Sequence, residues 1–222
     1  MKIKFNLILF ILIGLFTGNA GAQVVDIKTI DELITFDIIE NGTVLNANQA
    51  FVQQTGNYNT ALSIQQQEGT FSNRNILNQN GAGNNAYMEQ IGEGHIARII
   101  QTGDNNEVNS WSVGQFVNIA IEQNGGNNIV NSYIDNKSSM PKEAMLQQYG
   151  NNNKIDIALF GDGFSSESLE KTATITQTGN EHVVTAILDT YASPIIIEQK
   201  AGPSGEGMKV NISNSSFNFP MK

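Results

Sequence analysis

Apolar and small residues alternate with more polar ones along most of the chain. Every second residue is apolar, small or an amide in the segments 84–90, 95–101, 106–110 and 117–123, and the residues between them are mixed and often charged. A period of two over six or seven residues is typical of a β-strand with one buried face, whereas a helix would need a period near 3.6. The pattern therefore predicts short strands, each with one face in a core.

The strands belong to a repeat with a step of eleven residues. The unit reads Gln, any residue, Gly, two residues, Asn, any residue and then a small or apolar residue; clean copies begin at Gln54, Gln79, Gln101, Gln123 and Gln148. A glycine followed by polar residues is typical of a tight turn, because Gly adopts positive φ at no steric cost. We expect the turn glycines to be Gly56, Gly69, Gly81, Gly92, Gly103, Gly114, Gly125, Gly150, Gly161 and Gly179.

One strand and one turn per unit, with two units per lap of about 22 residues, predict an all-β fold, a β-solenoid of stacked strand-turn-strand laps. Stacking at about 4.7–4.8 Å places identical positions above one another, as in cross-β structure. Side-chain amides can then bond from lap to lap, which avoids the cost of about 1–3 kcal/mol for a buried amide without partners. The predicted structural amide ladder comprises Gln54, Asn59, Gln67, Asn73, Gln79, Asn84, Gln90, Gln101, Asn106, Gln123, Asn128, Gln148, Asn153, Gln177 and Gln199.

Composition agrees with a core built from amides. The chain has 222 residues, of which 29 are Asn and 16 are Gln, while only 15% are charged and none is Cys. The absence of Cys excludes disulfides, thiolate metal sites and cysteine nucleophiles. A net charge of −9 makes an electrostatic nucleic-acid partner unexpected.

The first 22 residues have the features of a secretory signal peptide. Lys2 and Lys4 precede an apolar run over 7–16, and Ala20-x-Ala22 predicts cleavage before Gln23. The apolar run is too short for a membrane span, which needs about 20 residues. The remainder divides into an N-terminal segment (23–47), the repeat region (48–201) with insertions near 137–145 and 162–172, and a C-terminal segment (202–222) that could be a weak cap or another strand.

The unit Gln-x-Gly-x-x-Asn-x-Ala, with the next Gln eleven residues on, resembles the curlin repeat of curli fibre subunits over about residues 48–201. The resemblance implies a subunit of an extracellular bacterial amyloid fibre that polymerises with itself and functions in biofilm and adhesion. It also implies Sec-dependent secretion, an outer-membrane export channel, and a nucleator or co-subunit of the same family. Residues 23–47 occupy the place of that family's secretion-targeting segment.

Other functions have weaker support in the sequence. His95 and His182 stand in Asn positions without an acidic residue nearby on the inward face, so we expect no catalytic residue, metal or cofactor and no enzyme. The ladder amides could instead bind a ligand, and the outward or turn aromatics could stack on carbohydrate or on a neighbouring fibre; the latter are Tyr58, Tyr87, Trp111, Tyr133 and Tyr149. Dispersed acids such as Glu93, Asp104 and Glu107 are typical of gatekeepers against aggregation. The alternative function is a discrete, capped β-solenoid that binds carbohydrate or a surface ligand without polymerising.

Overall fold

A computed structural model of the chain describes residues 23–28, 47–137, 140–160, 173–189, 195–202 and 205–213. Within these ranges it contains fifteen strands and no helix. The strands are β1 (Gln23–Lys28), β2 (Gln49–Thr55), β3 (Thr60–Gln67), β4 (Arg74–Asn80), β5 (Asn85–Glu93), β6 (Ile96–Thr102), β7 (Glu107–Gln115), β8 (Val117–Asn124), β9 (Ile129–Asn136), β10 (Lys142–Tyr149), β11 (Lys154–Phe160), β12 (Ala173–Thr178), β13 (Val183–Asp189), β14 (Ile195–Lys200) and β15 (Lys209–Ser213).

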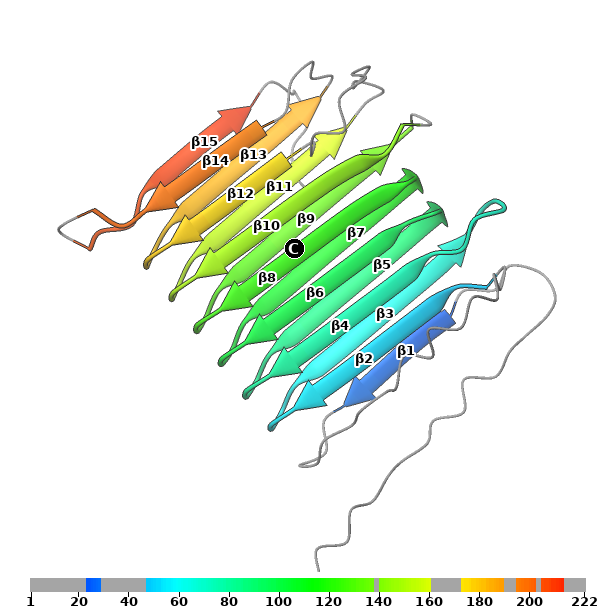
Figure 1. Cartoon of the computed structure of the whole chain (residues 1–222), viewed down its shortest axis with the longest axis horizontal. Helices are drawn as coiled ribbons and strands as arrows, with labels where there is room; N and C mark the ends of the chain where they lie inside the picture. Colours follow the sequence, from blue (N-terminus) through cyan, green and yellow to red (C-terminus); the bar gives the residue numbers. More distant parts are fainter. Residues whose placement is uncertain are drawn as a thin grey trace, which may run out of the picture.

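The chain winds alternately through two sheets, as the ribbon in Figure 1 shows. Odd-numbered strands form an eight-stranded sheet, here called sheet A, in the order β1-β3-β5-β7-β9-β11-β13-β15. Even-numbered strands form the seven-stranded sheet B, in the order β14-β12-β10-β8-β6-β4-β2. Successive strands of each sheet are parallel from β3 and β2 onward. These stacked laps confirm the predicted β-solenoid.

The pairing keeps equivalent positions of the repeat in register. Gln79 pairs with Gln101 and Gln101 with Gln123, and the two members of each pair are 22 residues apart, as the predicted lap requires. Gln123 pairs with Gln148, which is 25 residues further on, so this lap is longer. The extra residues lie in the turn before β10, because β10 already begins at Lys142. The first insertion is therefore shorter than the predicted 137–145.

Several predictions fall on parts of the chain that the structure does not describe. The insertion near 162–172, the turn glycine Gly161 and the signal peptide (1–22) all lie outside the described residues.

The core lies between the inward faces of the two sheets. Along most strands buried and partly exposed residues alternate, as in the pattern iBiBiB of β4 and β9, which follows from the period of two in the sequence. β11 is an exception, because five successive residues from Ile155 to Leu159 are buried. The central row of sheet B is apolar throughout: Val52, Leu77, Ile99, Ile121, Leu146, Ile175 and Ile197. Small residues such as Ala61, Ala86 and Ala97 fill the narrow parts of this core and are at most 1% exposed.

The two terminal strands of sheet A lie outside the repeat region predicted at 48–201. At the C-terminal end β15 adds a parallel strand beside β13, so the C-terminal segment contributes another strand. At the N-terminal end β1 runs antiparallel along β3, and no feature of the repeat predicts it. Both terminal strands belong to sheet A, and sheet B ends at β2 and β14.

Candidate functional site

One column of glutamines runs the whole length of sheet B. Each Nε2 donates to the Oε1 of the glutamine in the next lap at 2.7–2.9 Å. The members are Gln54, Gln79, Gln101, Gln123, Gln148, Gln177 and Gln199, each 2% exposed or less. This Gln column is the longest polar feature of the core.

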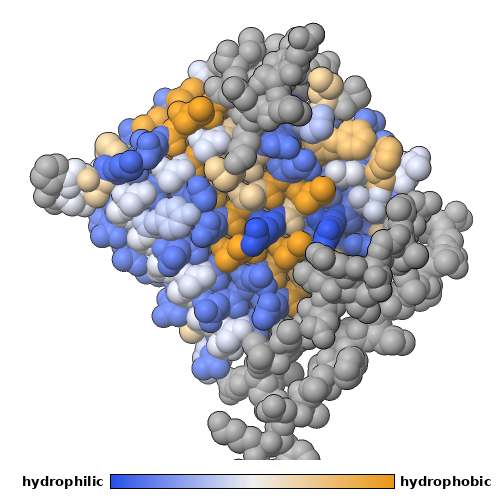
Figure 2. All heavy atoms as spheres, viewed as in Figure 1, coloured by the Kyte–Doolittle hydropathy of each residue, from blue (hydrophilic) through white to orange (hydrophobic). Residues whose placement is uncertain are grey.

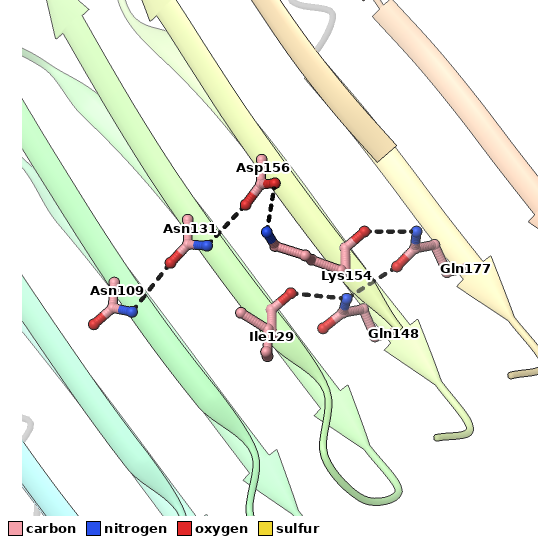
Figure 3. Close-up of polar contacts among 7 residues, drawn as sticks. All are labelled: Asn109, Ile129, Asn131, Gln148, Lys154, Asp156 and Gln177. Atoms are coloured by element: carbon pink, nitrogen blue, oxygen red, sulfur yellow. Dashed lines mark hydrogen bonds and ion pairs between the residues drawn. The ribbon is translucent and has the colours of Figure 1, made fainter. Parts of the chain in front are cut away.

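From Gln79 onward, each amide of the Gln column also connects the two sheets. The Nε2 of Gln148 donates to the carbonyl oxygen of Ile129 at 3.1 Å, and that of Gln177 donates to the carbonyl oxygen of Lys154 at 3.0 Å (Figure 3). Gln101 bonds Asn85 in the same way at 3.0 Å. Both Nε2 protons are therefore used, one along the stack and one across the core, which satisfies a buried amide as its burial requires.

The equivalent column of sheet A is short. Gln65 donates to the Oε1 of Gln90 at 2.9 Å, and the positions that follow in register hold Ser112, Ile134, Leu159 and Leu188. The Nε2 of Gln90 and the Oγ of Ser112 have no hydrogen-bond partner at the point where the amides stop. Sheet A thus changes from an amide column to an apolar one.

Gln67 was predicted to be a ladder residue, and the structure gives that position to Gln65. Gln65 is buried opposite Gln90, whereas Gln67 pairs with Gly92 and its Nε2 donates to the carbonyl oxygen of Gly69. Gln65 and Gln90 are 25 residues apart, and the extra residues of this lap lie in the loop after β3 rather than in the strand. Counting back from Gln79 by about one repeat therefore reaches Gln67, the last residue of β3, instead of Gln65. Gly69 is displaced in the same way, because the residue that pairs with Gly92 is Gln67.

A column of asparagines precedes the strands of sheet A. The Oδ1 of each accepts the backbone N–H of the next member at 2.9–3.1 Å, and Nδ2 donates to the carbonyl oxygen of the turn glycine one lap on at 2.7–2.9 Å. Its members are Asn59, Asn84, Asn106, Asn128 and Asn153. Asn73 makes the same contacts before sheet B, accepting from His95 N–H and donating to Gly92 O. These bonds hold each turn to the next.

The two histidines replace asparagine in these columns. The Nδ1 of His95 accepts the N–H of Val117 at 3.2 Å, and its Nε2 lies 3.2 Å from the carbonyl oxygen of Ile91. His182 contacts Met208 N–H and the Thr178 carbonyl in the same way. Nδ1 thus takes the place of the amide oxygen, which requires a neutral ring protonated on Nε2. Burial lowers the pKa of His95, opposed by the hydrogen bond to Ile91 and by the charge of Glu93.

The predicted turn glycines on one lateral edge stack on one another. Gly56, Gly81, Gly103, Gly125, Gly150 and Gly179 all have φ between +101° and +132°. A Cβ at Gly103 would lie under 3.0 Å from the carbonyl oxygen of Gly125 in the next lap. Glycine is required here by the left-handed backbone and by the close approach of successive laps.

Outward side chains form polar and aromatic contacts between laps. The Nδ2 of Asn109 donates to Asn131 at 3.0 Å, and Asn131 donates to Asp156 at 2.7 Å, whose second oxygen pairs with Lys154 at 3.0 Å (Figure 3). The rings of Tyr87 and Trp111 have centroids 5.4 Å apart. Apolar and strongly hydrophilic side chains intermingle on the face seen in Figure 2.

Of the remaining outward aromatics, Tyr133 continues the row of Tyr87 and Trp111 on sheet A, because it pairs in register with Trp111, and the other two lie elsewhere. Tyr133 contacts Phe160 on sheet A, Tyr149 donates to Glu122 on sheet B, and Tyr58 lies 83% exposed in a turn. The predicted gatekeepers lie outside the core: Asp104 accepts Ala82 N–H, Glu93 accepts Thr70 N–H, and Glu107 accepts from Asn109. These carboxylates thus accept hydrogen bonds at turns and at strand ends.

Two features of the site were not predicted from the sequence. The outer ladder Asn109–Asn131–Asp156 follows the lap rather than the unit, with one step of 22 residues and one of 25 residues, so a search by lap finds it. Lys142 is 1% exposed and donates from Nζ to the carbonyl oxygen of Asp135 at 2.8 Å. In the register of sheet B, Lys142 occupies the position after Val117, in a column that begins with Asn73 and His95. A lysine at such a position is not predicted from the sequence to be buried.

In the described ranges no group of three or more His, Cys, Asp or Glu side chains is arranged to hold a metal ion. A search of the same ranges finds no helix that is long and apolar enough to cross a membrane.

At the N-terminal end of each amide column, the first side-chain oxygen has no hydrogen-bond donor. Gln54 and Gln65 each have a buried Oε1 with no hydrogen-bond partner. Gln54 lies on β2, the last strand of sheet B, and Gln65 lies on β3, next to the terminal strand β1 of sheet A. At the other end the Nε2 of Gln199 donates to the carbonyl oxygens of Met208 at 2.8 Å and Val183 at 3.3 Å. The Gln column therefore ends in an unsatisfied acceptor at β2, whereas at β14 the Nε2 of Gln199 bonds the carbonyl oxygen of Met208 in place of a further glutamine.

Comparison with protein families identifies one segment of the solenoid. Residues 72–103, which include β4, β5 and β6, match the family model described as Curlin associated repeat. This match confirms the resemblance that the repeat unit shows in the sequence. No curated protein and no solved structure matches the chain significantly.

Proposed function

Because the chain carries a curlin associated repeat on a β-solenoid, we propose that it is a structural subunit of a curli-type fibre on a bacterial surface, which polymerises edge to edge. The observation that supports polymerisation most strongly is the buried Oε1 of Gln54, which has no partner at the end of an otherwise complete column. A buried acceptor without a donor costs about 1–3 kcal/mol, so the β2 end favours a partner that supplies a donor. A second copy of the chain supplies it from Gln199, whose Nε2 exchanges its bond to the carbonyl oxygen of Met208 for one to Gln54.

The backbone of sheet B fits the same joint. Gln49 N–H bonds β4 through Asn73 O, and N–H groups of alternate residues face opposite edges of a strand, so Val52 directs its N–H away from β4. In β14, Ala201 N–H bonds Thr178 O, so Glu198 directs its N–H away from β12 by the same alternation. Continuing the internal register places β2 of one copy parallel to β14 of another, with Gln54 opposite Gln199.

The core also continues across this joint. In the columns defined by the internal register, Ile197 meets Val52 on sheet B and Val210 meets Ala61 on sheet A. All are apolar residues, like the neighbours within the solenoid. Unpaired edge strands are ready templates for a further chain, and edge-to-edge addition covers them.

The remaining parts of the proposal follow the resemblance to curli subunits. The chain is secreted through Sec with cleavage after Ala22, leaves through an outer-membrane channel, and assembles with a nucleator or co-subunit of the same family. The fibre functions in the biofilm matrix and in adhesion, and the subunit is not an enzyme. An amide-rich core with Gly turns supports a structural role, since its polar groups are used in bonds between laps.

Incubation of the secreted form, residues 23–222, tests polymerisation. We expect fibrils that bind amyloid dyes and give a cross-β reflection at about 4.7 Å. A solution that remains monomeric at all concentrations would refute the proposal and would favour a discrete, capped solenoid.

A proline at the edge of β14 tests the joint itself. Glu198 is an outward residue with a side chain 58% exposed, and its N–H faces the edge of β14 that has no neighbouring strand in the described part of the chain. Glu198→Pro therefore removes a donor that the joint needs and that the pairing with β12 does not use. We expect Glu198→Pro to fold and to elongate poorly. Glu198→Ala is the matched control, because it loses the same ion pair with Lys200 but retains the N–H. Equal elongation of the two variants would show that β14 is not at the joint.

A further inference from the structure

The two sheets end differently at the N-terminal side of the solenoid. In sheet B, β2 is the last strand and its outer edge has no neighbouring strand in the described part of the chain. In sheet A, β3 is followed by β1, with six residues in antiparallel register from Gln23 opposite Gln65 to Lys28 opposite Thr60. It is the single antiparallel pair among the described strands.

β1 occupies the backbone groups that a second copy would need. Thr60 N–H bonds Asn84 O on the β5 side, so the alternate residues Ala61, Ser63 and Gln65 direct their N–H and C=O groups toward β1. Their partners in β1 are Ile27, Val25 and Gln23. In a fibre with the internal register, the same groups of β3 pair with β15 of another copy.

We propose that β1 is an intramolecular cap on the growing end of sheet A, which must leave β3 before β15 of a second copy can pair there. This proposal rests on the proposed function. Among the described residues sheet B has no such cap, so a joint can begin between β14 and β2 and be completed when β1 is displaced. Displacement is favoured in the complete joint, because β14 and β15 pair with both sheets while β1 covers sheet A alone.

The position of β1 fits regulation of assembly. The strand begins at Gln23, the residue predicted to follow the signal-peptide cleavage site, so it is available as soon as the mature chain folds. An antiparallel cap also cannot continue the parallel register, which blocks in-register addition without offering a new parallel edge. A free subunit is thereby protected from premature polymerisation at this end.

Two neighbouring proline variants separate the cap from other effects of β1. Val25 directs its N–H toward Ser63, whereas the N–H of Asp26 faces the opposite edge, so Val25→Pro breaks the pairing and Asp26→Pro is the matched control. We expect the lag before fibre growth to shorten about five-fold for Val25→Pro, the equilibrium factor of one backbone hydrogen bond. Asp26→Pro should change it much less. A Val25→Pro lag equal to or longer than that of the wild type would overturn the cap.

A reversible covalent lock gives the opposite test. Asp26 and Leu62 are directly opposite each other as a non-hydrogen-bonded antiparallel pair, where Cα atoms lie about 4.5 Å apart, within the range for a disulfide. The native chain has no Cys, so Asp26→Cys with Leu62→Cys introduces a single possible disulfide. We expect no fibres from the oxidised form during the time in which the reduced form completes assembly, and equal rates would refute the cap. If the wild type and every variant fail to assemble, the result refutes the proposed function and, with it, the proposal that β1 is a cap.

Discussion

Replacement of Gln101 by alanine removes one member from the middle of the Gln column. Its Nε2 donates to Gln123 at 2.9 Å and to Asn85 O at 3.0 Å, and its Oε1 accepts from Gln79 at 2.8 Å. At about 1 kcal/mol net for each hydrogen bond, the loss amounts to about 3 kcal/mol. The site is 0% exposed, so bulk water does not reach the groups left without partners.

Urea unfolding and seeded elongation measure this effect independently. We expect Gln101→Ala to lose about 3 kcal/mol of unfolding free energy, a large share of the roughly 5–15 kcal/mol that is usual for a domain. Elongation should slow as well, because each added subunit must fold the same column. Gln115→Ala is the matched control, since this glutamine is exposed at the end of β7 and the change should stay within about 0.5 kcal/mol. Glu107→Ala tests an outward position, where one bond from Asn109 is lost.

The order of these variants decides the assignment of inward and outward positions. If Glu107→Ala or Gln115→Ala destabilises the chain more than Gln101→Ala, the Gln column does not stabilise the core as its geometry indicates.

Three further variants test other parts of the structure. Gly103→Val should slow folding and assembly and cost about 1–3 kcal/mol from backbone strain alone, with a further clash against Gly125; unchanged kinetics would place the turn elsewhere. Gln65→Ala should destabilise the chain more than Gln67→Ala in urea, because Gln65 is the buried partner of Gln90; the reverse order would restore the position predicted from the sequence. Because burial lowers the pKa of His95 below 6.5, the folded state prefers the neutral ring, so stability is full above about pH 6.5 and falls as the pH decreases below it. His95→Asn should reduce that loss between pH 7 and pH 5, and an unchanged pH profile would show that His95 is not its source.

The repeat made the fold predictable because its spacing records the stacking. A Gly in most units, eleven residues apart, and a period of two between turns together define the strand, the turn and the inward face. The burial of Gln101, Gln123 and Asn106 follows directly from that pattern. The spacing becomes misleading where a lap contains extra residues. From the sequence alone, the residues added between Gln65 and Gln90 could lie in the strand or in the loop, and only the pairing with Gln90 decides between Gln65 and Gln67.

Features that depend on pairing outside the repeat could not be predicted. β1 contains no repeat unit, and it pairs antiparallel with β3 because that strand has an edge free for pairing. Lys142 is buried because its amine reaches the Asp135 carbonyl, a contact that depends on how the preceding turn folds. In both cases the local sequence is compatible with several environments, and tertiary contacts select one.

The direction of the Gln column imposes a polarity on any fibre built from this subunit. Every Nε2 from Gln54 to Gln177 donates toward the later lap. One end therefore has an acceptor without a donor, and the other end has the Nε2 of Gln199, which bonds the carbonyl oxygen of Met208. Two subunits meeting at their β2 ends would bring two Gln54 acceptors together with no donor between them, and both would remain unsatisfied at about 1–3 kcal/mol each. Meeting β14 against β2 satisfies Gln54 and keeps the strands parallel. Head-to-tail growth is therefore favoured over head-to-head contact by the side chains as well as by the strand direction. We expect the two ends of the fibre to differ in growth rate, because only one of them carries the proposed cap β1.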